Sequence, residues 1–100
     1  MATRTNQSAD KIFTVLDVLF RNFVTGYTPS ELAKATGLTP TNITRAVLTL
    51  EKAGYAERIH DTGRIRVSVA VARKAIQVAQ NVETAENRIS ELKTRLFTNV

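Results

Sequence analysis

Two Thr-Pro pairs that lie eleven residues apart, Thr28-Pro29 and Thr39-Pro40, constrain the fold of this chain more than any other feature. Each pair offers a capping hydroxyl followed by a proline at the first helical position, where a missing N–H costs nothing. Glu31, three residues after Thr28, completes a capping box. Gly37 can adopt the left-handed backbone that ends a helix. The sequence therefore predicts two short helices joined by a tight turn, a helix-turn-helix unit, whose second helix typically enters the DNA major groove.

The second helix, predicted over about residues 40 to 53, has one apolar and one polar face. Its apolar residues follow the spacing of a core-facing stripe: Ile43, Ala46, Val47 and Leu50. On the polar face Arg can bind guanine and Asn can bind adenine with two hydrogen bonds each. The residues predicted to contact DNA from this helix are Thr39, Thr41, Asn42, Thr44, Arg45, Thr49 and Lys52. Thr28 and Ser30, at the start of the preceding helix, are predicted to join them. The alternative is an ordinary solvated face.

A basic hairpin is predicted directly after this helix. Gly54 ends the helix, the segments 55–59 and 65–69 alternate as short strands do, and the turn residues Asp61-Thr62-Gly63-Arg64 lie between them. A basic wing beside a recognition helix commonly holds phosphate or enters the minor groove. The wing residues predicted to contact DNA are Arg58, His60, Arg64 and Arg66. The alternative is a solvated hairpin whose charges only discourage aggregation.

The stretch from Ser8 to Val69 resembles the N-terminal DNA-binding domain of IclR-type transcription regulators. The likeness rests on the opening helix around Ile12, on Thr28 to Leu38, on Asn42 to Arg45, and on Leu48 to Tyr55. It implies a winged helix-turn-helix that binds double-stranded DNA. Full-length members carry a large C-terminal effector-binding domain, whereas one helix follows the wing in this sequence. No small-molecule effector is therefore expected for this chain.

The core is expected to form between the opening helix and the helix-turn-helix. The opening helix would contribute Ile12, Val15, Leu16, Leu19, Phe20 and Phe23. They would pack against Leu32, Leu38, Ile43, Val47 and Leu50. Phe13, Val18 and Leu48 lie off these stripes and are expected to cover a neighbouring helix or a second subunit.

Composition limits the class of protein. The chain has no cysteine, so it has neither a disulfide framework nor a thiolate zinc site, and it has no apolar run long enough for a signal peptide or a membrane span. His60 is the only histidine and has no ligand partner at metal-binding spacing. Neither a nucleophile elbow nor a phosphate-binding Gly-rich loop is present. The sequence predicts a cytoplasmic or nucleoid-associated protein without cofactor, metal or enzymatic activity.

The net charge of +5 is unevenly distributed. Through Lys74 the chain has eleven Lys and Arg against six Asp and Glu, and beyond it three cations balance three acids. All of the excess positive charge therefore lies in the predicted DNA-binding part, as expected for a protein that displaces counterions from phosphates.

A heptad pattern fills the C-terminal part. Apolar residues recur at alternating steps of four and three: Val71, Ala75, Val78, Val82, Ala85, Ile89, Leu92 and Leu96. They predict a helix of about 26 residues, roughly 39 Å long, that needs a partner surface. The simplest partner is a second copy of the chain, and the alternative is that the helix folds back onto the opening helix. Parallel pairing would bring Arg88 near Lys93 of the second copy, whereas antiparallel pairing could bring Glu86 near it, so the orientation stays open.

The predicted fold is mainly α with a small β-hairpin, a winged helix-turn-helix followed by a long C-terminal helix. Residues 1–7 are predicted to form a flexible arm, 8–69 the winged domain and 70–100 a dimerisation helix. The leading hypothesis is a sequence-specific DNA-binding regulator, a repressor that acts as a dimer on a pseudopalindromic site. The alternative is a winged-helix adaptor that binds other proteins, with weak or non-specific DNA binding.

Overall fold

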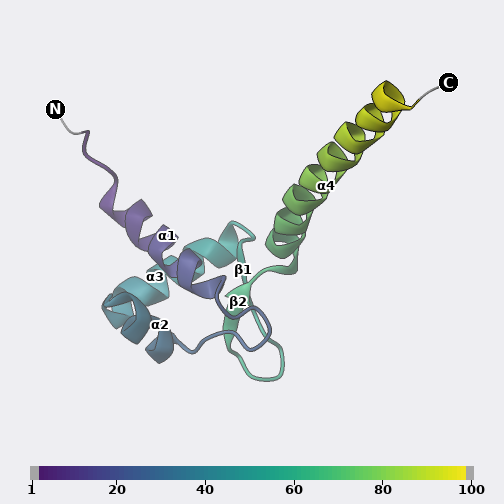
Figure 1. Ribbon diagram of the computed structural model, residues 1–100. Coiled ribbons are helices and arrows are strands. Elements are labelled where there is room, and N and C mark those ends of the chain that lie inside the picture. The colour runs from purple at the N-terminus through teal and green to yellow at the C-terminus, as the bar shows by residue number, and fades with distance from the viewer. Residues whose placement is uncertain (1–2, 99–100) are drawn as a thin grey trace.

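The computed structural model describes residues 3–98 as a small winged domain with a long helical arm (Figure 1). Three helices come first and are followed by two strands and a fourth helix. Their bounds are α1 Gln7–Leu19, α2 Pro29–Thr36, α3 Pro40–Lys52, β1 Ala56–Arg58, β2 Ile65–Val67 and α4 Val69–Phe97. The mainly helical winged fold predicted from the sequence is confirmed.

The two Thr-Pro pairs begin helices as predicted. The Thr28 side chain accepts a hydrogen bond from the Glu31 backbone N–H at 3.2 Å, and the Glu31 carboxylate accepts the Thr28 N–H at 2.8 Å, so the capping box is complete. Thr39 caps α3 by accepting the N–H of Asn42. Gly37 ends α2 with a φ of 74°. Local sequence chemistry therefore sets both ends of the turn between α2 and α3.

The wing is a two-stranded antiparallel sheet in which Glu57 pairs with Arg66. Tyr27 adds a bridge to the free edge of β2, because its N–H donates to the Ile65 carbonyl at 2.7 Å and its own carbonyl accepts the Ile65 N–H at 2.8 Å. This bridge ties the segment before α2 to the wing. The helix-turn-helix and the hairpin are therefore one packed unit.

The core lies where α1 packs against α2, α3 and β2. Most of the predicted residues are there, with Val15, Leu19, Leu32, Ile43 and Val47 almost fully buried. One prediction is wrong: Phe20 is 47% exposed, since it follows the end of α1. Val18, predicted to cover a neighbouring helix or a second subunit, is 3% exposed within the domain, because three elements surround α1 and bury a face wider than one stripe.

Helix α4 is anchored to the domain only at its start. Ser68 caps it: the Ser68 hydroxyl accepts the Val71 N–H at 3.1 Å and donates to the Gly54 carbonyl at 2.7 Å. The sequence assigns Val69 to a strand, but this residue begins α4 because the Ser68 cap ends the wing. Val71 is 7% exposed and belongs to the domain core. Its assignment to a dimerisation seam is therefore wrong for this residue.

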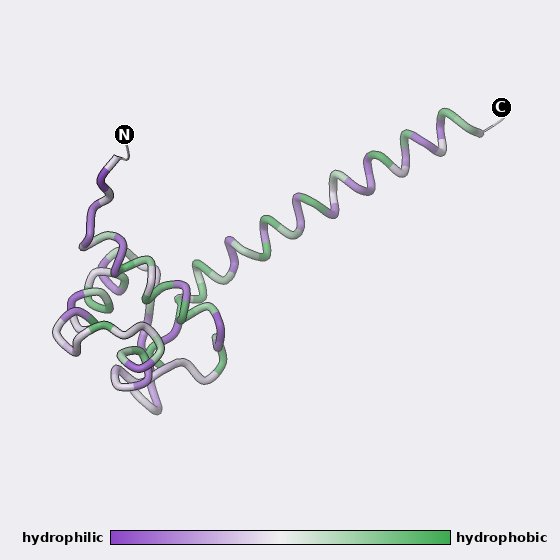
Figure 2. Tube along the Cα trace, turned by 60° about the vertical axis from the view of Figure 1, so that its left-hand side comes forward, coloured by the Kyte–Doolittle hydropathy of each residue, from purple (hydrophilic) through white to green (hydrophobic). Residues whose placement is uncertain are grey.

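The rest of α4 leaves the domain as a free arm, which Figure 2 shows as a single straight trace with alternating apolar and polar turns. Every described residue from Arg73 onward is exposed. The radius of gyration is 19.7 Å, against about 13 Å for a compact chain of this length. Folding back of this helix onto the opening helix, the alternative weighed from the sequence, does not occur.

Helix α1 begins at Gln7 and α4 at Val69, each one residue before the start predicted for the winged domain and for the tail. Gln7 is already helical and Asn6 caps α1, so the predicted arm over residues 1–7 is shorter, and its first two residues lie outside the described part. The predicted tail over 70–100 likewise ends in two residues that lie outside it. Within residues 3–98 no helix has the length and apolarity needed to cross a membrane.

Candidate nucleic-acid interface

Helix α3 presents the polar face predicted from its sequence. Thr41, Thr44, Arg45, Thr49 and Lys52 are exposed, while the opposite face is buried in the core. The Thr44 hydroxyl donates to the Pro40 carbonyl at 3.0 Å, and the Thr49 hydroxyl donates to the Arg45 carbonyl at 2.9 Å. These bonds leave the threonine methyl groups and the oxygen lone pairs available to a partner. A threonine methyl group can contact the methyl group of thymine in the major groove.

Asn42 and Arg45 are the two side chains of this face that can bind a base with two hydrogen bonds. Neither makes a side-chain hydrogen bond or ion pair within residues 3–98. Both line an open hollow of about 460 Å³ between α3 and the first turns of α1. Ser8 and Lys11 of α1 complete its polar lining.

A smaller hollow of about 240 Å³ lies between the first turns of α2 and α3. It brings together Ser30 and Thr44, which are both predicted DNA contacts. Thr28 is half-buried, and its hydroxyl and N–H are both used in the capping box. The Thr28 backbone N–H, with help from the Arg64 guanidinium, lowers the pKa of the Glu31 carboxyl below its usual value. The start of α2 therefore offers Ser30 to a partner, while Thr28 maintains the helix.

Arg64 is directed into the molecule. Its Nε donates to the Thr25 carbonyl at 3.2 Å and its Nη2 to the Gly26 carbonyl at 3.1 Å, and the same nitrogen pairs with the Glu31 carboxylate. The side chain is 25% exposed. These contacts join the wing to the segment that leads into α2.

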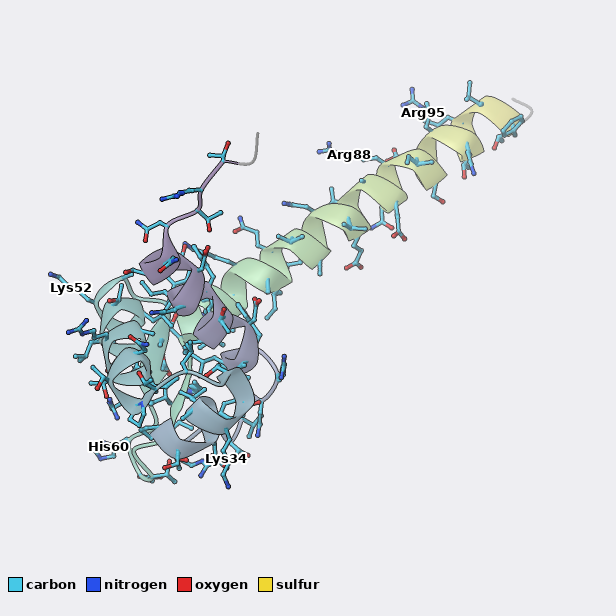
Figure 3. All side chains as sticks on the ribbon, turned by 90° about the vertical axis from the view of Figure 1, so that its left-hand side faces the viewer. Lys34, Lys52, His60, Arg88 and Arg95 are labelled. Atoms are coloured by element: carbon cyan, nitrogen blue, oxygen red, sulfur yellow. The ribbon has the colours of Figure 1, made fainter. Side chains whose placement is uncertain are left out.

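The other two wing arginines also have partners in the chain. Arg66 pairs with Glu57 at 2.9 Å and lies over the Phe23 ring, whose centroid is 5.0 Å away. Arg58 lies 3.4 Å from Glu51 and is 48% exposed. Of the predicted wing contacts, Arg58 and His60 therefore remain the most accessible, and Figure 3 shows His60 projecting at the edge of the domain.

Most of the positive charge left on the domain lies outside the wing. Within residues 3–98 three Glu residues are each paired with a wing arginine, which leaves cations on α2, α3 and the start of α4, while Lys11 shares α1 with Asp10 and Asp17. Lys11 and Ser8 were missed as candidates because periodicity places them on a polar face of α1 and cannot say that α3 lies beside that face. No local sequence signal would have identified them.

Comparisons with known proteins agree with this arrangement. A family model described as the IclR helix-turn-helix domain matches residues 8–60. The crystal structure of HmgR from Pseudomonas aeruginosa is similar to this chain, with a TM-score of 0.59 and 21% sequence identity over 76% of this chain. The match spans 29% of the HmgR chain. No curated protein matches this sequence. Because the family model covers more than half of the residues, including both helices of the helix-turn-helix and β1, this chain belongs to the IclR helix-turn-helix domain family, whose members are DNA-binding domains of transcription regulators.

Proposed function

We propose that this protein binds a specific double-stranded DNA site as a homodimer and represses transcription by occupying that site in the cytoplasm. The observation that carries the proposal is the α3 surface. Arg45, which is exposed, and Asn42, which is half-buried, lie there one helical turn apart, and the described residues give neither a competing side-chain partner. The opposite face of α3 packs into the domain core, so the helix can enter a major groove together with the domain.

The residues have distinct roles in this proposal. Arg45 and Asn42 bind base edges, and Thr41, Thr44 and Thr49 supply methyl and hydroxyl contacts. A second set, at the margins of this face, binds the phosphate backbone: Ser30, Lys52, Arg58 and His60. Thr28 and Thr39 act through their helix caps. Arg64 and Arg66 position the wing through their ion pairs.

Helix α4 supplies the dimer contact. Along its heptad seam Val78, Val82, Ile89, Leu92 and Leu96 are between 54% and 69% exposed. A solvent-exposed apolar stripe of this length costs free energy in a monomer. In the proposed dimer the same seam of a second copy packs against it and removes it from water. With Val71 in the domain core, the proposed seam runs from Ala75 to Leu96.

The direction of α4 favours parallel pairing. Figure 3 places Lys52 and His60 on one side of the domain and Arg88 and Arg95 on the arm that leaves in the opposite direction. In a parallel pair the two-fold axis runs along the arm, and both recognition helices face the same duplex. Antiparallel pairing would direct the two faces away from one another. The like-charge approach of Arg88 to Lys93 of the second copy is a surface contact worth a few tenths of a kcal/mol.

Selection from a pool of random duplexes, followed by sequencing, tests the function. The protein should enrich a motif with two-fold symmetry, because two recognition helices related by the α4 pair contact one duplex. Ile89→Glu places a charge in the seam, and this variant should be monomeric in analytical ultracentrifugation and lose the symmetric motif. Ile76→Glu is the matched control, since Ile76 is similarly exposed at 56% but lies off the seam. Absence of any motif with the wild-type protein would refute sequence-specific binding and favour an adaptor.

A further inference from the structure

The hollow between α1 and α3 is lined by two different elements and has a distinct chemistry. Four of its residues come from the polar face of α3 and the first turns of α1: Ser8, Lys11, Asn42 and Arg45. Ile12, Ala46 and Leu48 supply the apolar part of its lining, and no acidic residue lines it. We propose that this hollow seats a backbone phosphate beside the major groove, bound by Lys11 and Ser8 of α1. The inference rests on the proposed function and extends its contact surface to α1.

Lys11 and Ser8 lie one helical turn apart, so their side chains share one face of α1. Ser8 is exposed in the first turn, where the free backbone N–H groups of the helix add partial positive charge. Lys11 is half-buried, and a lysine in such a position typically packs its carbon chain on the protein and keeps its ammonium in water. A cation held in this way loses less conformational freedom on binding than a fully exposed lysine does.

The neighbouring acid does not neutralise the site. Asp10 accepts a hydrogen bond from the Thr5 hydroxyl at 2.5 Å and does not line the hollow. Lys11 and Arg45 form no ion pair with any acid among residues 3–98. The wing differs from this hollow, because the three wing arginines, Arg58, Arg64 and Arg66, are each already paired with a carboxylate of the chain.

The position of the hollow indicates a backbone phosphate rather than a free anion. The hollow shares Asn42, Arg45 and Thr49 with the α3 face proposed to enter the major groove. A duplex bound at that face would therefore lie along the edge of the hollow. The two sugar-phosphate strands flank a helix in the groove on either side, and α1 lies on one of those sides. Leu48, 57% exposed, and Ile12 give the deoxyribose an apolar surface to contact.

The salt dependence of binding tests this site. Lys11→Gln removes one phosphate contact per half-site, so the slope of log K against log salt should fall by about 1.8 for a dimer on a two-fold site. The ratio of the wild-type DNA-binding constant to that of the variant should then fall about twelvefold between 50 and 200 mM salt. Arg73→Gln, which removes an equal charge from the exposed outer face of α4, is the control and should leave the slope unchanged. Both variants should select the wild-type motif.

Methylphosphonate substitution locates the contact. Replacing single phosphates of the selected duplex by neutral methylphosphonates should identify one position per half-site where wild-type binding weakens and binding of the Lys11→Gln variant does not weaken further. Equal slopes for the Lys11→Gln variant and the wild type, with the motif still bound, would overturn the α1 site alone. Binding of inorganic phosphate at millimolar concentration by the wild type but not by the Lys11→Gln variant, with no methylphosphonate position that weakens wild-type DNA binding, would indicate a free-anion site and would also overturn the proposal. Failure of the wild-type protein to bind any duplex would overturn the proposed function itself.

Discussion

The Glu57 carboxylate accepts a hydrogen bond from the backbone N–H of Val69 at 3.0 Å, which joins the first strand of the wing to the first residue of α4. The same carboxylate pairs with Arg66. With the Ser68 cap, these contacts fix the direction in which the arm leaves the domain. A change in this junction should therefore alter the stability of the domain and, in the proposed dimer, the spacing of the two α3 helices.

Ser68→Ala should lower the free energy of unfolding by about 1–2 kcal/mol. The substitution removes the cap of α4 and leaves the Gly54 carbonyl without the hydroxyl that donates to it. Urea denaturation followed by circular dichroism measures the change. Ser90→Ala is the control: this serine is exposed in the last third of α4, and its replacement should change stability by less than about 0.5 kcal/mol. Equal stabilities for the two variants would mean that the junction is not rigidly held.

Stability should decline in acid because two ionised carboxylates, those of Glu31 and Glu57, stabilise the native state. The backbone N–H of Val69, with Arg66, lowers the pKa of Glu57, and the backbone N–H of Thr28, with Arg64, lowers that of Glu31, both from a usual value of 4.5. A lowered native pKa means that the contribution is fully present above pH 4.5 and is lost as the pH falls through the native value. Glu57→Gln should be less stable than wild type at pH 7, and the difference should narrow below pH 4. Thermal unfolding across this range is the measurement. A constant difference would contradict the linkage.

Gly26→Ala should be much more harmful than Gly37→Ala. Both glycines have a positive φ, 70° and 74°, but a Cβ at Gly26 would lie 2.5 Å from the Ile65 carbonyl oxygen, whereas one at Gly37 would meet nothing within 4 Å. Gly37→Ala should cost only the left-handed strain of about 1–2 kcal/mol. Gly26→Ala should cost more, because the clash also disrupts the bridge between Tyr27 and Ile65. Chemical denaturation of both variants tests the order, and equal losses would refute the close approach.

Arg64→Gln should act on stability and leave the salt dependence of DNA binding almost unchanged. Its guanidinium is occupied by two carbonyls and the Glu31 carboxylate, so its loss should lower the free energy of unfolding by about 1–3 kcal/mol. If Arg64 instead bound phosphate, the slope of log K against log salt would fall by about 0.9 per half-site. Denaturation and binding titrations on the same preparation distinguish the two roles.

The helix-turn-helix was predictable because its signals are local. Thr28, Glu31 and Gly37 act on backbone groups within a few residues, and the structure contains the caps and the stop that they specify. The wing arginines and α1 were harder, because their partners lie far away in the sequence. Arg64 meets Glu31, thirty-three residues away, and Lys11 shares a hollow with Arg45 only through the packing of α1 on α3. Val71 fits the heptad and the domain core equally well by spacing alone, and only packing decides between them.

Recognition of a DNA sequence by α3 is tested most directly by a fluorescence anisotropy titration of the selected duplex with the wild type and with Arg45→Ala. Arg45 is exposed on the recognition face, and replacing it should not affect the fold. The variant should lose about 1–3 kcal/mol of binding free energy in each half-site, which is about 5- to 150-fold in affinity per half-site, and should lose preference at one base pair in each. Unchanged affinity and preference for Arg45→Ala would contradict recognition by this face.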